Sequence, residues 1–459
     1  MSNEWTRQTV AELQAEGLLL VEDGNHGEYR PRTSEFGSGS WAFIRAADMD
    51  GGTVLFESAE RINDAAFKRI RKGVGKGGDV LFSHKGTVGK LAIAPIDAPS
   101  FVCSPQTTFW RTLDESRLSR RFLYYYMQSR TFTEQWMGRK GETDMADYVS
   151  LTAQRELFVS IPPPSEQQAI ADVLGLLDDK IEQNRRTGRK LEALARAVFK
   201  AWFVDFEPVK VKAAGGTAFP GMPPATFAAL PTRLVDSELG PVPEGWHSTN
   251  LGDEFDLLVG FAFKSADFTD SPDAIRLVRG DNVKEGWIEW GNKTRRWSEV
   301  NERINRYHLA AGDVVIGMDG SKLGKNWSRV REIDLPSLLV QRVARFRSTR
   351  NAGPSLLWLL ISHSTFREFV DAVKTGTSIP HISGSQLKGF SFLKPGPTAG
   401  EIWCGFEEVV RPLLSLADHL SAESVKLAAL RDYLLPRLLS GRVRVQGLSK
   451  NGEDSCSLI

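Results

Sequence analysis

The sequence predicts an α+β protein with two mixed α/β domains and two long helices between them. Three observations lead to this fold class. Short stretches of the chain recur at nearly one offset, two segments carry a seven-residue apolar period, and a chain of 459 residues normally makes two to four domains. The recurrence predicts an internal pseudo-repeat of domains. The apolar period predicts helices that pack on each other as a coiled-coil spacer.

The recurrence consists of six pairs of short matches in the same order, at offsets that stay between 233 and 236 residues. Each match is weak alone, but six in order indicate that one half-molecule occurs twice. The pairs are Phe43–Met49 with Leu277–Val283, Gly78–Val80 with Gly312–Val314, Lys85–Lys90 with Gly320–Lys325, Gln106 with Gln341, Ser129–Phe132 with His363–Phe366, and Val149–Ser150 with Ile382–Ser383.

Each half ends in a proline-rich segment followed by a helix-start pattern. Three prolines precede Ser165 and Gln168 in the first half, and a Pro-Gly-Pro sequence precedes Thr398 and Glu401 in the second. These side chains have the spacing of a capping box, in which they satisfy each other's backbone N–H groups. We therefore expect a long helix to begin at each of these sites.

The first long helix is expected at about residues 166–203, and the second begins near residue 398. Both carry apolar residues at heptad spacing, a pattern typical of coiled coils and also of ordinary core packing. Asn184 lies in the first seam, where a polar residue fixes register, and Pro436 is expected to kink or end the second helix near Arg437. The residues assigned to helix packing and partner docking are Ile170, Leu174, Leu177, Ile181, Leu191, Trp202, Phe203, Leu413, Leu420, Leu427 and Leu434.

These signals also set the domain boundaries. Inside the first domain we expect helices at 9–17 and 119–136 and strands at 79–83 and 91–94. The chain divides into a first domain (1–163), a first long helix (164–206), an extended linker rich in Pro, Gly and Ala (207–240), a second domain (241–396), a second long helix (397–445) and a disordered tail (446–459).

The net charge of +1 is the sum of unlike regions. Residues 61–90 hold eight Lys and Arg against two acids, and residues 276–350 hold sixteen against nine, whereas residues 1–60 hold four against eleven. Each half therefore has a basic region, interleaved with glycines and aromatics. Such regions fit phosphate and base-edge contacts, although on charge alone a solvated surface with compensating acids explains them as well.

Several function classes lack their motifs. The Gly-Lys segments lack Walker A spacing, the Pro-Pro pairs lack the flanks of an amino-methyltransferase motif, and no nuclease core follows Pro272–Asp273. The seven histidines show no i, i+4 pair, and Cys103, Cys404 and Cys456 have no metal or disulfide spacing. We expect no catalytic site and no metal site. Without a run of ~18 apolar residues or a signal-peptide core, we expect a cytoplasmic protein that contacts no membrane.

The helix segments resemble those of the specificity subunits of type I restriction–modification enzymes. Val242-Pro-Glu-Gly-Trp246 with Leu251-Gly252-Asp253 also resembles the start of a second target-recognition domain, a pattern that the first half lacks. The resemblance covers nearly all of residues 1–445. The segments that carry it are Ile161–Ile170, Leu177–Asn184, Leu191–Leu194, Phe199–Phe206 and Leu430–Gly441.

The resemblance implies a non-catalytic DNA-recognition subunit. Each target-recognition domain would recognise one half of a bipartite site in double-stranded DNA. Two antiparallel helices would set the spacer and dock two copies of the methyltransferase subunit, and restriction (translocase) subunits would join them. The complex would have adenine-N6 DNA methyltransferase and ATP-dependent endonuclease activities. S-adenosylmethionine, ATP and magnesium would belong to the partners, and none would be bound by this chain.

Candidate DNA-binding residues follow from the repeat and the basic regions. Positions shared by two domains that recognise different bases carry little sequence information, so we expect phosphate or framework roles for them, and base contacts from the unmatched loops 25–32 and 287–296. The candidates are Arg45, Lys72, Lys76, Lys85, Thr87, Lys90, Gln106, Arg279, Arg295, Arg296, Ser321, Lys322, Lys325 and Gln341.

Two rival hypotheses remain open from the sequence. One is a scaffold protein with two binding heads on a coiled coil and no affinity for DNA. The other is a self-contained modification enzyme, which the missing motifs oppose.

Overall fold

The computed structural model describes residues 5–24, 26–142, 147–238, 240–291, 294–298, 301–349, 352–376 and 378–443. It is a mixed α/β fold with two long helices, in two compact units. Unit 1 comprises Met1–Glu182 with Val425–Ile459, and unit 2 comprises Gln183–Ser424. The tail predicted at 446–459 lies outside the described residues.

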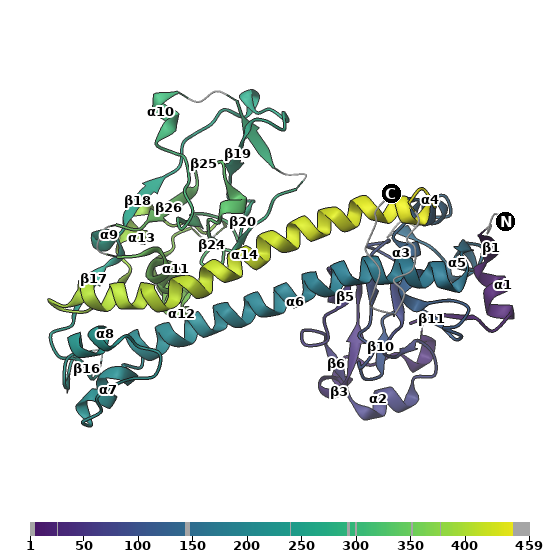
Figure 1. Ribbon diagram of the computed structural model, residues 1–459, viewed down its shortest axis with the longest axis horizontal. Coiled ribbons are helices and arrows are strands. Elements are labelled where there is room, and N and C mark those ends of the chain that lie inside the picture. Colours follow the sequence, from purple (N-terminus) through teal and green to yellow (C-terminus); the bar gives the residue numbers. More distant parts are fainter. Residues whose placement is uncertain are drawn as a thin grey trace, which may run out of the picture. The chain divides into compact units, whose positions relative to one another are not determined.

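Unit 1 is built on a six-stranded sheet with the order β2-β11-β8-β9-β5-β4, in which β11 pairs antiparallel with β2 and β8. Figure 1 labels β5 and β11 of this sheet. A four-stranded sheet has the order β6-β3-β10-β7 with β10 parallel to β3, and β1 pairs antiparallel with β14. The strands are β1 Thr6–Thr9, β2 Leu19–Asp23, β3 Phe36–Ile44, β4 Met49–Asp50, β5 Thr53–Val54, β6 Arg61–Ile62, β7 Val74–Gly75, β8 Val80–Ser83, β9 Leu91–Ile93, β10 Phe101–Cys103, β11 Thr107–Thr112, β12 Gly141–Glu142, β13 Asp147–Tyr148 and β14 Phe158–Ile161.

Side-chain caps define the short helices of unit 1. Thr9 and Glu12 form a capping box, and Ser119 and Ser129 each accept a hydrogen bond from a first-turn N–H. Because Ser129 starts a new helix, the single helix predicted at 119–136 is two helices. The helices are α1 Val10–Ala15, α2 Asp64–Arg69, α3 Arg120–Met127, α4 Arg130–Met137 and α5 Leu151–Arg155.

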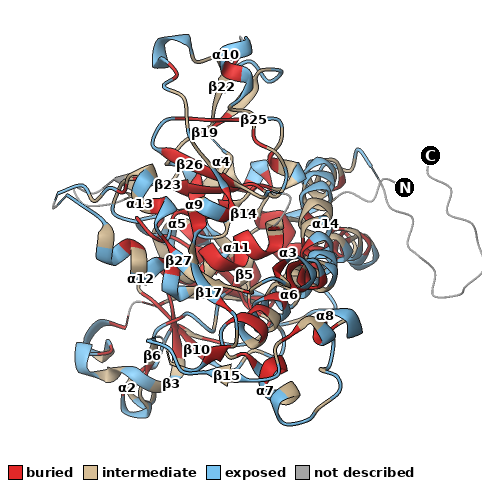
Figure 2. Ribbon diagram, turned by 90° about the vertical axis from the view of Figure 1, so that its left-hand side faces the viewer, coloured by how far each residue is buried: buried red, intermediate tan, exposed pale blue. Residues whose placement is uncertain are grey.

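Unit 2 contains a four-stranded sheet with the order β18-β26-β23-β24, a β22-β19-β25 sheet with β19 parallel to β25, and an antiparallel β17–β27 pair. Its central strands β23 and β26 are buried (Figure 2). The strands are β15 Leu234–Val235, β16 Val242–Pro243, β17 His247–Asn250, β18 Asp256–Val259, β19 Ile275–Val278, β20 Val283–Lys284, β21 Trp287–Ile288, β22 Arg295–Trp297, β23 Val314–Gly317, β24 Trp327–Arg329, β25 Ser337–Leu339, β26 Val343–Arg347 and β27 Ser391–Lys394.

The strand pairings of the two units follow the same order. In unit 1, β1 pairs with β14, the last strand before α6, and in unit 2, β17 pairs with β27, the last strand before α14. The β2-β11-β8-β9 order of unit 1 corresponds to β18-β26-β23-β24 in unit 2, and the parallel pair β3–β10 corresponds to β19–β25. The remaining helices are α9 Leu251–Glu254, α10 Glu302–Asn305, α11 Pro354–Ser362, α12 Ser364–Val373 and α13 Gly384–Lys388.

Residues 207–240, predicted as an extended linker, contain two helices, α7 Glu207–Ala213 and α8 Pro224–Ala229. Val209 and Phe227 are buried in the main core of unit 2. The Lys212 ammonium also donates to the carbonyls of Phe227, Ala228 and Leu230, which joins the two helices. The prediction was wrong because helices this short show no periodicity in sequence.

The long helices are α6 Pro164–Phe203 and α14 Ala399–Leu439, close to their predicted spans. The predicted capping boxes do not describe their starts. Since Pro164 is the first helical residue, Ser165 lies inside α6. The Thr398 hydroxyl donates to the Ala229 carbonyl, and the Gln168 amide donates to Asp172.

Within each unit the local parts of α6 and α14 pack antiparallel. In unit 2, Phe199, Trp202 and Phe203 each contact the ring of Phe406, and the buried Asn184 amide donates to Glu423 at 2.6 Å. In unit 1, Ile170 and Leu174 share a core with Leu438, and Arg431 donates to Asp178. Of the residues assigned to helix packing, Ile170, Leu174, Ile181, Trp202 and Phe203 are buried, and Leu177, Leu191, Leu413, Leu420, Leu427 and Leu434 are half-buried.

Candidate nucleic-acid interface

The strongest candidate site in unit 1 is one edge of its main sheet. Strands β2 and β8 end there, and β9 and β11 begin there, so the connecting loops lie at the same edge. We call these loops edge 1; its described residues are 26–32, 84–90, 104–106 and 147–149 together with Gly24.

Backbone hydrogen bonds hold edge 1 in place. Gly24 N–H donates to Thr107 at 3.1 Å, His84 N–H donates to Gln106 at 2.9 Å, and Val149 N–H donates to His84 at 2.8 Å. Ser83, at the end of β8, donates from its hydroxyl to the Thr87 carbonyl at 2.6 Å. The loop positions therefore depend on backbone groups and a buried serine, and the exposed side chains are free to differ.

Unit 2 has the same arrangement at the corresponding sheet edge. Gly260 N–H donates to Val343 at 3.0 Å, Met318 N–H donates to Arg342 at 2.9 Å, and Ile382 N–H donates to Met318 at 2.9 Å. We call these loops edge 2; its described residues are 260–264, 318–326, 340–342, 375–376 and 378–382.

Two glycines make the close packing of these loops possible. A Cβ added at Gly24 would lie 2.1 Å from the Cys103 carbonyl oxygen, and one at Gly260 would lie 2.1 Å from the Val340 carbonyl oxygen. Sequence reasoning missed both residues. Each follows an apolar strand, and they lie one repeat apart, so the signal was present in the sequence.

The hydrogen bonds correct the register of two predicted matches. His84, the residue after β8, donates from its N–H to the Gln106 carbonyl, and Met318, the residue after β23, donates to the Arg342 carbonyl. Gln106 therefore corresponds to Arg342, not to Gln341. Similarly, the N–H of Ser83 donates to the Lys90 carbonyl, whereas the N–H of Gly317 donates to that of Asn326, not Lys325. Small insertions in the 318–326 loop shift the sequence match from the structural one.

The predicted DNA-binding residues fall into two groups. Most of those at the edges have exposed side chains, but four of the predicted residues contact the rest of their own unit. Lys90 donates to the carbonyls of Ala46 and Met49, and Arg296 donates to those of Pro272 and Ala274. Arg45 pairs with Glu60, and Arg279 lies near Asp281. Arg295 is half-buried, 3.8 Å from Asp270. The exposed candidates are Lys72, Lys76, Lys85, Thr87, Gln106, Ser321, Lys322, Lys325 and Gln341.

The loops expected to make base contacts are only partly described, since Asn25, Asn292 and Lys293 lie outside the described residues. Within them, Arg71 lies 5.0 Å from the Tyr29 ring, and Arg276 lies 4.4 Å from the Trp290 ring. Trp290 also donates to Asp334 at 2.9 Å, so its indole belongs to the framework of unit 2.

Edge 1 contains two buried histidines, His26 and His84, with exposed fractions of 5% and 7%. The His26 ring donates to the Cys103 carbonyl at 2.9 Å, and the His84 ring donates to the Val149 carbonyl at 3.2 Å. Burial lowers the pKa of both rings below the ordinary value for histidine. Both rings are therefore neutral supports of the loops near pH 7.

Edge 2 borders a basic cavity of about 500 Å³. Lys374 and Arg367 share the Asp371 carboxylate, and the Lys374 ammonium holds the pKa of that carboxyl below its usual value. Lys322 and Lys325 are exposed and form no ion pair among the described residues. A cavity with this excess of cations fits a phosphate group.

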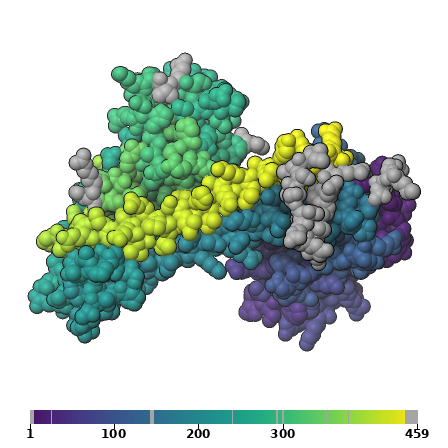
Figure 3. Space-filling view, in the orientation of Figure 1, coloured from purple at the N-terminus to yellow at the C-terminus, as the bar shows by residue number. Residues whose placement is uncertain are grey.

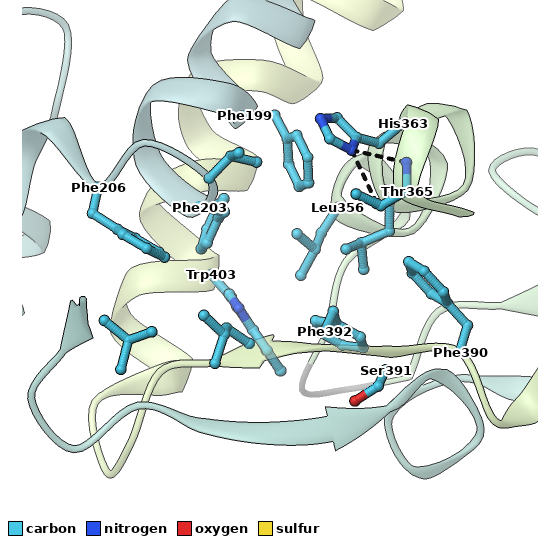
Figure 4. A pocket seen from close by; sticks show the side chains of 14 residues that line it. Phe199, Phe203, Phe206, Leu356, His363, Thr365, Phe390, Ser391, Phe392 and Trp403 are labelled. Carbon is cyan, nitrogen blue, oxygen red and sulfur yellow. Dashed lines mark hydrogen bonds between the residues drawn. The ribbon is translucent and has the colours of Figure 1, made fainter. Parts of the chain in front are cut away.

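An apolar pocket of about 340 Å³ lies elsewhere in unit 2, between the end of α6, α11, β27 and the start of α14 (Figure 4). Its walls are aromatic, and its one titratable group is His363, whose Nδ1 lies 3.0 Å from the Thr365 hydroxyl and whose pKa is lowered by burial. None of its lining residues belongs to edge 2. The aromatic lining residues are Phe199, Phe203, Phe206, Phe390, Phe392 and Trp403.

Two negative findings apply to the part of the chain that the structure describes. No group of His, Cys, Asp and Glu residues there is arranged to hold a metal ion. No helix in the same ranges has the length and apolar content needed to cross a bilayer.

Exposed Lys, Arg, Gln, Ser and Thr side chains on loops held by backbone hydrogen bonds, repeated in two units, are typical of a nucleic-acid-binding protein. Comparison with known proteins agrees. Residues 29–193 match the model of the type I restriction modification DNA specificity domain. Over most of its length the chain is similar to specificity subunits of type I restriction enzymes, as the sequence predicted.

Two relatives match nearly end to end. The MjaIX specificity subunit of Methanocaldococcus jannaschii is 24% identical over 91% of this chain and 90% of its own length. The HindI specificity subunit of Haemophilus influenzae is 23% identical over 87% of this chain and 94% of its own. The crystal structure of the type I restriction–modification S subunit from M. genitalium has a TM-score of 0.56 at 15% identity, covering 95% of this chain and 97% of that one, which supports the fold.

Proposed function

We propose that this chain is the DNA sequence-specificity subunit of a type I restriction–modification complex, and that units 1 and 2 are duplicated target-recognition domains. Each would recognise one half of a bipartite site in double-stranded DNA. The observation that carries this proposal is the pair of loop edges, in which the same backbone hydrogen bonds present different exposed side chains. Different side chains on one scaffold are what two unlike half-sites require.

The two edges supply both kinds of contact that DNA recognition needs. Lys85, Lys322 and Lys325 are exposed cations that would contact phosphates and set affinity and its salt dependence. Polar side chains on the same loops would contact base edges and set specificity. Because α6 and α14 each contain residues of both units, we propose that this helix pair sets the distance between the half-sites.

We further propose that the long helices dock methyltransferase subunits, two copies to a complex, which restriction subunits then join. Support comes from large apolar side chains that α6 and α14 leave exposed. The space-filling view shows α14, in yellow, at the surface (Figure 3). Leu176 is 62% exposed, and Tyr433 is 56% exposed. Exposed apolar groups on a helix are typical of a protein-docking surface. In this proposal S-adenosylmethionine, ATP and magnesium are bound by the partners in the cytoplasm, and none by this chain.

Methylation mapping tests the proposal. The chain is co-expressed with a partner adenine methyltransferase subunit in a host free of other adenine methylation, and modified sites are mapped across the genome. We expect one bipartite motif, which disappears when this gene is deleted. An unchanged methylome with an active methyltransferase present would contradict the proposal.

A domain exchange tests the modular assignment. Residues 1–163 are replaced by the equivalent segment of a relative with a different motif. We expect one half of the motif to change while the other half and the spacer stay the same. A change in both halves would refute separate recognition by the two units.

A further inference from the structure

We propose that Gln106 and Arg342 are equivalent specificity-determining residues, and that Gln106 recognises an adenine in one half-site while Arg342 recognises a guanine in the other. This inference rests on the proposed function and assigns it particular bases. It departs from the match of Gln106 with Gln341 that the sequence favours.

The equivalence follows from the hydrogen bonds around each residue. Gln106 is the last residue of the three-residue connection 104–106, which joins β10 to β11. Arg342 is the last residue of the connection 340–342, which joins β25 to β26 in the same way. The first residue of each connection donates to a strand end, Ser104 to Ile44 and Val340 to Val278. The two connections therefore place their third residues at the same point of each edge.

Both side chains are available to a ligand. Gln106 is exposed, and its side-chain amide forms no hydrogen bond to the described residues. The Arg342 side chain is 67% exposed, and its nearest ion-pair partner is Asp319, at 3.9 Å from Nε. A contact this long between exposed groups holds the guanidinium weakly and leaves its terminal nitrogens free.

Each edge has a glycine with open space around it at the same place in the loop. Gly86 and Gly320 occupy the same place in the two edges, since their N–H groups donate to Asp147 and Pro380. Both have positive φ, +78° and +97°. A Cβ at Gly86 would meet only the Gln106 amide, at 3.7 Å, and one at Gly320 would meet nothing within 4 Å. The backbone next to Gln106 is therefore bare at Gly86, and the equivalent glycine of edge 2 is also open.

The backbone of Arg342 supports a role in recognition. Its φ is +67°, a conformation that arginine rarely adopts and that Gly or Asn would adopt more readily. Strained non-glycine residues cluster at ligand-binding sites, where the surrounding structure holds them in place. Gln106 does not share this positive φ, so the backbones of the two connections differ at their third residue.

The bases follow from side-chain chemistry. The glutamine amide offers one acceptor and one donor, which match N6 and N7 of adenine in the major groove. The guanidinium offers two parallel donors, which match O6 and N7 of guanine. Lys85 forms an isolated β-bridge with Tyr148, and Asp319 forms the equivalent β-bridge with His381. A lysine in edge 1 at the position of an aspartate in edge 2 makes edge 1 locally more positive.

The test exchanges the two side chains in the co-expressed complex and maps methylation. For Arg342→Gln we expect the preference for guanine at one position of one half-site to fall roughly 5- to 150-fold, with the other half-site unchanged. For Gln106→Arg we expect the matching change from adenine in the other half-site. Arg342→Gly removes the side chain and relieves the backbone, so loss of the same guanine preference in a folded complex assigns the effect to the guanidinium.

Gln341→Ala is the matched control, because Gln341 is an exposed amide next to Arg342 and is expected to leave the motif unchanged. Binding of the wild-type complex to a duplex with 7-deazaguanine at the assigned position should weaken roughly tenfold, while Arg342→Gly should bind both duplexes equally. An unchanged motif in Arg342→Gln and Arg342→Gly would overturn the inference, even if wild-type methylation confirmed the proposed function. Absence of any sequence-specific methylation by wild type would overturn both.

Discussion

Edge 1 and edge 2 share a backbone arrangement but differ in their side chains. Edge 1 has His84, Lys85 and Gln106 at the positions where edge 2 has Met318, Asp319 and Arg342, although the main backbone hydrogen bonds of the two edges correspond. The comparison teaches that the loop shape is determined by backbone bonds and close-packed glycines. The chemistry of the surface is then left to a few exposed side chains. Variants that affect one edge and spare the other can test this separation.

The largest effect is expected from the close-packed glycines. Gly24→Ala and Gly260→Ala would each place a methyl group about 2.1 Å from a backbone carbonyl oxygen, so the loop must move. We expect each to lower the free energy of unfolding of its own unit by about 3 kcal/mol, near the upper end for overpacked sites. Urea denaturation followed by hydrogen exchange would assign the loss to one unit.

Gly400→Ala is the control for these variants, because nothing lies within 4 Å of a Cβ at that position of α14. It should leave stability unchanged or raise it by up to about 1 kcal/mol. Equal destabilisation of both units by Gly24→Ala would contradict the independence of the two edges.

The next largest loss of stability is expected from the carboxylates through which the long helices form ion pairs within each unit. In unit 2, Arg329 donates two hydrogen bonds to Asp418, at 2.7 and 2.8 Å, and in unit 1 Asp178 accepts from Arg431 and Tyr125, both at 2.7 Å. We expect Asp418→Ala to cost about 3 kcal/mol and Asp178→Ala about 2, because Arg329 is more deeply buried than Arg431.

Thermal unfolding of the matched variants would measure this difference. Asp432→Ala is the control, since Asp432 is 64% exposed and should contribute less than about 1 kcal/mol. A larger loss from Asp178→Ala than from Asp418→Ala would show that burial does not rank the two contacts.

A pH effect should separate the edges further. His26 and His84 have lowered pKa values in the folded protein, so their stabilising contribution is complete above the unfolded value of about 6.5. It is lost as pH falls below that value toward the folded pKa values. Unit 1 should therefore lose stability between about pH 7 and pH 5, a dependence that Met318 cannot give to edge 2.

His84→Met places the side chain found at the equivalent position of edge 2 in edge 1. We expect it to reduce the pH dependence of unit 1, measured by denaturation at pH 5.5 and pH 7.5. A pH dependence as steep as that of wild type would show that His84 does not titrate with unfolding.

The smallest effect is on salt dependence. Lys322→Gln should weaken binding of the complex to all DNA sequences alike and lower the slope of log K against log salt by about 0.9. Lys85→Gln should do the same from edge 1. A change in the methylated motif in either variant would mean that these lysines contact bases rather than phosphates.

Much of the fold could be predicted from the sequence, for reasons seen in particular elements. The heptad spacing from Ile170 onward extends over many residues, so it defined α6 closely. The helices of 207–240 are too short for such a signal. The start of α6 was misplaced because Pro164 begins the helix before Ser165 can cap it.

The candidate site was predicted in part. Glycine-containing basic loops led to Lys85, Lys322 and Lys325, which lie exposed at the edges. The sequence alone favoured Gln341 over Arg342, because two glutamines match better than a glutamine and an arginine. The backbone hydrogen bonds show that Gln106 corresponds to Arg342, and a pattern of residue types does not reveal those bonds. Nor does residue type reveal that Lys90 is occupied by the carbonyls of Ala46 and Met49.

The three-residue connections before β11 and β26 have a consequence for how such proteins diversify. The third residue of each connection is held through its backbone carbonyl, which accepts from His84 or Met318, so its side chain can differ between the two edges, although only Arg342 has a positive φ. Glutamine and arginine codons differ by a single nucleotide. If the two units recognise separate half-sites as proposed, a point mutation at this position would change one half of the recognition sequence and keep the other half.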